Sequence, residues 1–545
     1  MLRRVVCSLA IAGMAQASLA STSLAQDFYH PPTQANFEQV FEQETDQELL
    51  RPINFEYPEI APASAETFCA PDPFSGVPDP CDGCLPVAGG CDSIECEDEG
   101  WCSVLCSDKS VLDCLKGNEI GPFTYSAGGA LRYRYLSERN RLRPPLNGRY
   151  SSYDQWRLTP FLELKMGDDF TARVEAIDAS TFNEELPPLP IDVNRTDLLQ
   201  YFVDVKLLDS GTGEKLRVKA GRQLLLYGSQ HLVSPLAWAN TYRNFEGVKL
   251  YYTSDAWNID GFATRPVNGA SGNINRPLSY DTPDQSRTFS GVYSTYKNAP
   301  NGVLDLYWLW LDEDDDNPSL IDGDRHTFGS RYAGAVPIND ECGDLWMTLG
   351  WDYEGAIQTG SDVVGPGPAR DVLAGFVSTR TGLTFNTMPW TPTLDGVFFW
   401  GSGDSDPDDG TINTVSTLFP LGHAYWGQID NLDGQNLLDY SVQLTVNPSK
   451  KLNCQAQWHW FDKDKREDAI WNVAGAPFGG IVATESRHIG TELDLVATYK
   501  VNSNLTLQGG YFWFFYGDAV TENPNPQVAD RGNAESYYFF ADWKF

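Results

Sequence analysis

Residues 536–545 read SYYFFADWKF and end the chain. Apolar and aromatic residues occupy every second position of this stretch, at Tyr537, Phe539, Ala541, Trp543 and Phe545. This alternation predicts a β-strand with one apolar face. A soluble protein that exposed such an edge strand would risk aggregation, whereas a closed barrel pairs its last strand with its first and has no edge. The stretch therefore predicts a barrel, closed against a first strand near 123–135.

The same period of two recurs from Gly121 onward. Tyr440, Val442 and Leu444 share one face, and polar residues alternate with them. Comparable segments are 131–135, 201–207, 304–310, 452–460 and 493–499. Strands with one aromatic-rich apolar face and one polar face are typical of a wall between lipid and a water-filled lumen. We expect an all-β fold over residues 119–545, a transmembrane antiparallel up-and-down β-barrel of about 16 to 18 strands.

Composition agrees with this fold and excludes two other classes. Aromatic residues make up 13% of the chain, yet the mean hydropathy is −0.35 and no run of 18 apolar residues occurs, which argues against a helical membrane protein. The net charge of −35 argues against nucleic acid as a partner, because phosphate binding needs a basic surface. On composition alone, a large soluble β-sandwich or propeller stays an alternative.

The N-terminal part divides into three predicted segments. Residues 1–25 have the charged start, apolar run and small-residue cleavage site of a signal peptide, and 26–68 form an acidic linker. Residues 69–118 are predicted to be a cysteine-rich module in the periplasm. Its even number of cysteines predicts disulfides, with a zinc site as the alternative. The cysteines are Cys69, Cys81, Cys84, Cys91, Cys96, Cys102, Cys106 and Cys114. Cys342 and Cys454 are isolated and are expected to be unpaired.

Three stretches resemble a known family when they are taken in order. Residues 221–248 read GRQLLLYGSQHLVSPLAWANTYRNFEGV; residues 418–430 read LFPLGHAYWGQID and are followed by Asn436; residues 489–515 read IGTELDLVATYKVNSNLTLQGGYFWFF. Together they resemble segments of the alginate export family of outer-membrane β-barrels. The resemblance implies an outer-membrane barrel of about 18 strands. The family pattern lacks the acidic, cysteine-rich extension, which leaves open both the partners and a cargo other than alginate.

The polar faces of the predicted strands carry candidate pore residues. The predicted pore-lining or substrate-binding residues are Arg132, Arg134, Arg157, Arg173, Arg217, Lys219, Arg222 and Arg243. By resemblance, arginines at the constriction of the family contact uronate carboxylates, for which a guanidinium offers a permanent charge and a bidentate fork. The alternative is that these side chains pair with Glu163, Glu175, Asp204 and Glu246 and only brace the wall.

Two other patterns suggest chemistry less specifically. Asp404, Asp406 and Asp408 alternate before a glycine, as in a calcium loop, so a structural calcium ion is one hypothesis and a solvated acidic loop is the other. Ser229, His231 and Ser234 cluster, but no hydrolase motif surrounds them. We expect no enzyme activity and no other cofactor.

These observations predict an outer-membrane channel that passes an anionic, alginate-like polysaccharide through an arginine-lined lumen. One alternative is a general or small-solute porin of the same fold. Another is a structural outer-membrane protein whose cysteine-rich module binds a periplasmic partner. In each case the expected surroundings are outer-membrane lipid, with the N-terminal segment in the periplasm and no nucleic-acid partner.

Overall fold

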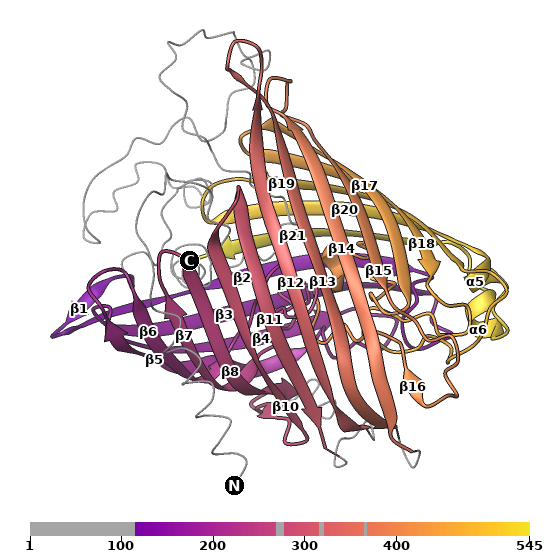
Figure 1. Cartoon of the computed structure of the whole chain (residues 1–545), viewed down its shortest axis with the longest axis horizontal. Coiled ribbons are helices and arrows are strands. Elements are labelled where there is room, and N and C mark those ends of the chain that lie inside the picture. The colour runs from indigo at the N-terminus through magenta and orange to yellow at the C-terminus, as the bar shows by residue number, and fades with distance from the viewer. Residues whose placement is uncertain (1–114, 269–276, 315–320, 365–367) are drawn as a thin grey trace.

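A computed structural model describes residues 115–268, 277–314, 321–364 and 368–545 (Figure 1). The described chain is almost entirely β, with three short helical segments, η2 (Gly422–Ala424), α5 (Asp518–Thr521) and α6 (Pro526–Ala529). The strands are β1 (Asn118–Ile120), β2 (Phe123–Arg139), β3 (Tyr150–Met166), β4 (Phe170–Phe182), β5 (Asn194–Asp209), β6 (Lys215–Gln223), β7 (Phe245–Thr253), β8 (Trp257–Asn268), β9 (Thr282–Pro283), β10 (Arg287–Ala299), β11 (Gly302–Glu313), β12 (Ile321–Asn339), β13 (Leu345–Val364), β14 (Arg370–Phe385), β15 (Thr393–Gly401), β16 (Thr411–Ile412), β17 (Leu437–Ser449), β18 (Leu452–Lys463), β19 (His488–Lys500), β20 (Leu505–Tyr516) and β21 (Ala534–Lys544).

Apart from the short strands β1, β9 and β16, the strands form one closed antiparallel ring of 18. Each strand pairs with its neighbour in the chain, and β2 pairs with β21 to close the ring. The closing register places Ala130 opposite Lys544, and the backbone of Phe545 exchanges hydrogen bonds of 3.0 and 2.9 Å with Gly129. The predicted barrel, its strand number and its closure by the last strand are confirmed.

The predicted alternation of faces is also present. Tyr440, Val442 and Leu444 are about half exposed on the outer wall, at 50%, 54% and 44% of their surface. Ser441 and Gln443 point the other way and are buried. The barrel is therefore apolar on the outside and polar on the inside, as a lipid-facing wall requires. No helix in the described ranges is long and apolar enough to cross a membrane.

The two ends of the barrel differ. At one end the strands are joined by short turns, such as 167–169, 254–256 and 450–451, and at the other end by long loops. Strand β1 and the C-terminus lie at the short-turn end, on the left in Figure 1, and α5 and α6 lie at the long-loop end. In outer-membrane barrels short turns face the periplasm and longer loops face the outside.

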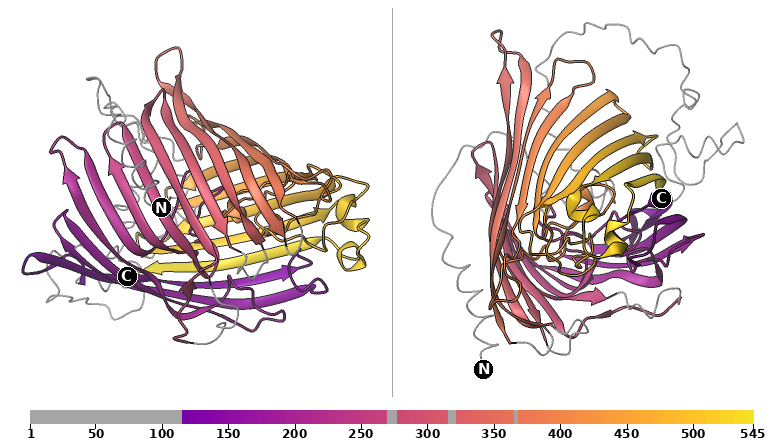
Figure 2. Two further views of the ribbon diagram at one scale, coloured as in Figure 1. Left: turned by 60° about the horizontal axis from the view of Figure 1, so that its bottom comes forward. Right: turned by 90° about the vertical axis from the view of Figure 1, so that its right-hand side faces the viewer.

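Two of the long loops fold into the barrel and meet there (Figure 2, right). Loop 224–244 follows β6 and loop 402–436 follows β15. They pair in parallel at Val233 and Phe419, with hydrogen bonds from Ser234 N to Phe419 O of 2.8 Å and from Phe419 N to Leu232 O of 2.9 Å. Buried apolar side chains from both loops pack in one cluster with inward residues of the wall. We refer to these two joined loops as the septum.

The predicted N-terminal segments, namely the signal peptide, the acidic linker and nearly all of the cysteine-rich module, lie outside the described residues. The eight cysteines predicted to form disulfides lie there too. Within the described ranges, Cys342 and Cys454 are free.

Candidate functional site

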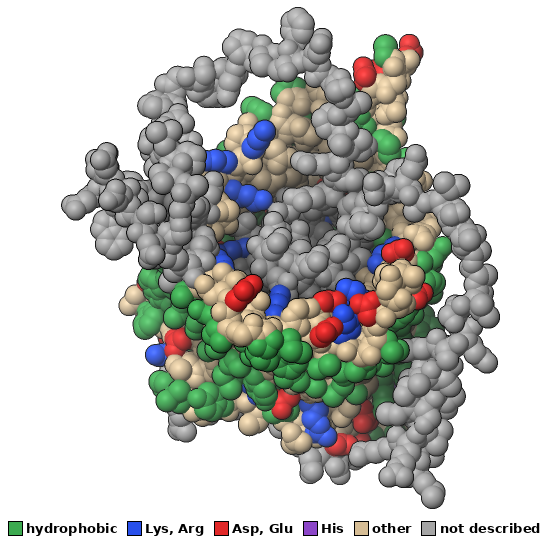
Figure 3. All heavy atoms as spheres, turned by 90° about the vertical axis from the view of Figure 1, so that its left-hand side faces the viewer, with side chains coloured by type: hydrophobic (Ala, Val, Ile, Leu, Met, Phe, Trp, Pro, Cys, Tyr) green, Lys and Arg blue, Asp and Glu red, His purple; other side chains and the backbone are tan. Residues whose placement is uncertain are grey.

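A cavity of about 620 Å³ lies inside the barrel at the short-turn end. Its rim includes the turn residues Asp168 and Asp255, and Leu224, Leu226 and Pro235 of the septum also line it. Seven cationic side chains line it, against the four acidic residues Glu163, Asp168, Asp204 and Asp255. We call this cation set the basic vestibule: Lys165, Arg173, Lys215, Arg217, Lys219, Lys249 and Lys297. Figure 3 looks onto this end, where Lys and Arg side chains lie among Asp and Glu side chains and hydrophobic ones band the outer wall.

Strand register creates the vestibule. Residues 215, 217 and 219 of β6 point inward because side chains alternate along a strand. Lys249 of β7 stands directly opposite Lys219. Like charges in that position repel each other, and two acids offset the repulsion: Asp204 lies 4.0 Å from Lys219, and Asp260 lies 3.5 Å from Lys249.

The vestibule contains three of the predicted pore residues. Arg173 pairs with Glu163 at 3.4 Å and with Glu175 at 3.1 Å, and its guanidinium lies over Phe161. Arg217 and Lys219 both lie beside Asp204, and each retains about 12% of its side-chain surface. These pairs are the ones expected under the bracing alternative. Seven cations line the cavity against four lining acids, or against six carboxylates when Glu175 and Asp260 are included.

Three other predicted arginines hold the septum. Arg132 and Arg157 are each only 1% exposed and donate to the backbone carbonyls of Ala237 and Ala239. Arg134 donates to the carbonyl of Trp238 at 2.9 Å and stacks on its ring. The guanidinium groups of these three arginines thus donate hydrogen bonds to backbone carbonyl oxygens of loop 224–244. The sequence showed that these arginines face inward, but not that a distant loop would fold onto them.

The last two predicted arginines lie elsewhere. Arg222 stands opposite Tyr201 and Glu246 in the ladder, so it lies on the other face of the sheet from Arg217. It pairs with Glu246 at 3.3 Å and donates to Asp281 O at 2.8 Å. Arg243, in loop 224–244, donates to the carbonyls of Ser234 and Pro420, and burial lowers its pKa to about 10. Neither residue lines the vestibule.

The opposite wall holds the other end of the septum. β13 is the eleventh strand of the ring counted from β2, so loop 224–244 crosses the lumen from the wall that carries Arg132 to the far side. There, Ser229 donates to Asp352, and His231 Nδ1 lies 2.7 Å from Glu354 Oε2. Arg331 secures this contact by binding Asp352 at 2.7 Å and Asp305 at 3.0 Å.

The two sides of the inner surface differ in their balance of charge. Strands β3 to β10 carry the basic vestibule with buried acid partners such as Asp204 and Asp260, whereas strands from β11 onward carry, beside Arg331, a larger set of buried inward carboxylates. They are Asp305, Asp352, Glu354, Asp395, Asp439, Glu492, Asp494 and Asp542. Two of them, Glu492 and Asp494, accept hydrogen bonds from the backbone N–H groups of Ile429 and Gln428 in the septum. Both walls thus hold the septum, one through cations and the other largely through carboxylates.

The serine and histidine cluster and the acidic loop singled out in the sequence lie in loops 224–244 and 402–436. Ser229 and Ser234 bind Asp352 and Gln230, so neither hydroxyl is paired with His231. The Asp404 carboxylate accepts from the backbone N–H of Asp406 at 3.0 Å, while Asp406 and Asp408 are exposed. The described residues contain no group of three His, Cys, Asp or Glu arranged to hold a metal ion.

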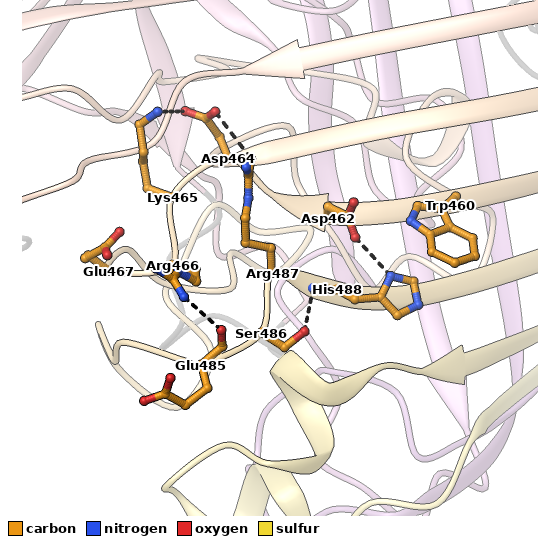
Figure 4. A pocket seen from close by; sticks show the side chains of 10 residues that line it. All are labelled: Trp460, Asp462, Asp464, Lys465, Arg466, Glu467, Glu485, Ser486, Arg487 and His488. Carbon is orange, nitrogen blue, oxygen red and sulfur yellow. Dashed lines mark hydrogen bonds and ion pairs between the residues drawn. The ribbon is translucent and has the colours of Figure 1, made fainter.

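A second cavity of about 680 Å³ lies at the long-loop end, where β18 and β19 enter their loop (Figure 4). Several of its side chains are paired: Asp464 lies 3.2 Å from Lys465 and 3.8 Å from Arg487, and His488 lies 2.9 Å from Asp462. Because its four acidic residues outnumber its three Lys and Arg residues, the basic vestibule is the better candidate for an anionic ligand.

Comparison with solved structures finds similar barrels at low identity. One is the outer membrane protein OprD from Pseudomonas aeruginosa, with 13% identity, a TM-score of 0.48, and coverage of 77% of this chain and 93% of that one. Another is a BenF-like porin from Pseudomonas fluorescens, with 12% identity, a TM-score of 0.49, and coverage of 77% and 98%. Comparison with curated proteins finds no match.

A family comparison is decisive. The family model for alginate export matches residues 123–534, which run from the first barrel strand to the start of the last. All three stretches singled out in the sequence fall within the matched range. The chain is therefore a member of the alginate export family, an outer-membrane β-barrel of the channel type.

Proposed function

We propose that this barrel passes an anionic polysaccharide of the carboxylated, alginate-like kind, with the basic vestibule as the mouth that the polymer contacts on the periplasmic side. The observation that carries the proposal is the excess of cations over acids in a cavity of about 620 Å³ inside the short-turn mouth. A narrow, low-dielectric mouth focuses the field of its own charges. Local charge therefore outweighs the net charge of −35 carried by the whole chain.

The chemistry of the lining suits a polymer that must bind and then leave. Arg173 and Arg217 are partly neutralised by Glu163 and Asp204, so each offers an attraction weaker than that of an isolated guanidinium. Repeated weak contacts let a charged chain enter without being trapped. The lysines provide the remaining contacts as mobile point charges. Arg132 and Arg157 are not part of the proposed contact surface, because both donate hydrogen bonds to backbone carbonyls of the septum.

The proposal is tested by current block in a planar bilayer. Oligouronates added on the short-turn side should reduce the current, and neutral dextran of equal length should not. Lys215→Gln combined with Lys219→Gln should weaken the block, whereas Lys450→Gln should leave it unchanged. Lys450 is a suitable control because it is exposed on turn 450–451 at the same end. Equal block by dextran and oligouronate would contradict the proposal.

The septum favours a second candidate, a porin for small anionic solutes. Loop 224–244 reaches both walls, and loop 402–436 packs against it, so the lumen is narrow between its two ends. Liposome swelling separates the two functions. A small-solute porin should admit monomeric uronate rapidly and show little block by the polymer, whereas a polysaccharide channel should show polymer block at low concentration.

A further inference from the structure

We infer that the basic vestibule is also the docking site for a segment of this same chain, the acidic stretch at residues 92–99. The occupant is identified by charge. Residues 92–99 read DSIECEDE, five carboxylates within eight residues and no Lys or Arg. The vestibule presents seven cations against four acids. The inference does not require the cargo to be a polysaccharide.

The course of the chain brings the segment to this mouth. β1 pairs with the first residues of β2, with Asn118 opposite Tyr125, and Thr124 stands opposite the vestibule residue Lys165 on β3. Neighbouring strands lie about 4.8 Å apart, so the chain enters the sheet roughly 10 Å from Lys165. Eighteen residues lie between Glu99 and Asn118, and the chain between these two residues can span at most about 65 Å. The acidic stretch can therefore reach the vestibule.

Tethering and the shape of the mouth both favour this contact. Because the acidic stretch belongs to the same chain, its binding is intramolecular and its effective concentration is in the millimolar range for a short tether. The cations lie within a cavity whose walls focus their field, whereas charge in open solvent is screened over about 8 Å at physiological salt. An acidic stretch docked here would present the same carboxylates as an anionic cargo and would compete with it.

Site-specific photocross-linking in the full-length chain tests the docking directly. A benzophenone side chain is placed at Thr253, a partly buried and uncharged residue that lines the same cavity as the vestibule cations. After irradiation, reduction and trypsin digestion, tandem mass spectrometry should place the cross-links within residues 92–99 of the peptide that ends at Lys109. Replacing the five acids (D92N, E95Q, E97Q, D98N, E99Q) should lower the yield about tenfold, because the electrostatic attraction is lost.

A matched variant controls for total charge. Replacing five acids between residues 38 and 48 (E38Q, E42Q, E44Q, D46N, E48Q) changes the net charge equally but lies outside the acidic stretch, nearer the N-terminus. This variant should leave the cross-link to 92–99 unchanged. The inference fails if the unmodified chain gives no cross-link to 92–99, if the 92–99 variant gives an undiminished one, or if both variants lose it equally. Cross-linking needs no cargo, so a failure of polysaccharide passage in bilayers would leave this result standing.

Discussion

Replacing Arg331 by leucine is expected to destabilise the barrel by about 3–5 kcal/mol, the usual effect of leaving a buried charge without its partner. The guanidinium binds Asp352 through two nitrogens at 2.7 and 2.8 Å and Asp305 through a third at 3.0 Å. Both aspartates are nearly fully buried, at 6% and 3% exposure. The variant would leave two buried carboxylates without a cation. It would also remove the hydrogen bond of 2.6 Å that Arg331 donates to Ser229 of the septum.

Unfolding in guanidinium chloride, followed by tryptophan fluorescence in detergent, measures this loss. A triple variant, Arg331→Leu with Asp305→Asn and Asp352→Asn, is the informative companion because it removes the unpaired charges together with the arginine. It should recover much of the lost stability, since a neutral buried set of similar size avoids most of the desolvation cost. A single variant that loses less than about 1 kcal/mol, or a triple variant no more stable than the single one, would refute this reasoning.

Three further outcomes are expected. Deleting Phe545 should lower the yield of assembled barrel in outer-membrane fractions, because the closing strand loses its backbone hydrogen bonds to Gly129; an unchanged yield would contradict this. Burial raises the pKa of Asp433 to about 7, above its ordinary 3.8, so stability should fall as pH rises from about 4 and level off above 7, by up to about 4 kcal/mol. Asp433→Asn should flatten this dependence in unfolding measurements at pH 5 and pH 8, and an equally steep profile would argue against it. Mass spectrometry without reduction should find most of the eight cysteines of residues 69–114 oxidised, whereas eight alkylatable thiols or stoichiometric zinc would reject that prediction.

The wall was predictable from the sequence because strand alternation is a local property. The faces of 440–446 and the closing strand at 536–545 follow from a period of two, without knowledge of any distant contact. Alternation also places Arg222 on the opposite face from Arg217 and Lys219. For this reason Arg222→Glu is expected to leave ion selectivity unchanged, although the surrounding motif had suggested a pore residue.

The septum was not predictable in the same way. Its contacts join segments far apart in the chain, such as Val233 with Phe419, and no periodicity encodes them. The hydrogen bonds from Arg132 to the loop carbonyls depend on those contacts, so they could not be predicted from the sequence either. Lys215, Lys249 and Lys297 were missed as lining residues, although the basic residues on the inward face of β6 were a signal to examine the rest of β6 and its neighbour β7.

The central claim is that the basic vestibule sets selectivity for anions in a protein whose net charge is −35. Its most direct test is the reversal potential in a planar bilayer under a potassium chloride gradient, measured on the full-length channel with the five acids of residues 92–99 replaced (D92N, E95Q, E97Q, D98N, E99Q), so that no docked carboxylate offsets the vestibule. This starting channel should prefer anions. Lys215→Glu with Lys219→Gln removes two positive charges from the lining and adds one negative charge, so it should shift the potential toward cations, whereas Lys450→Glu should not. A cation-selective starting channel, or a lysine double variant with an unchanged reversal potential, would contradict the account.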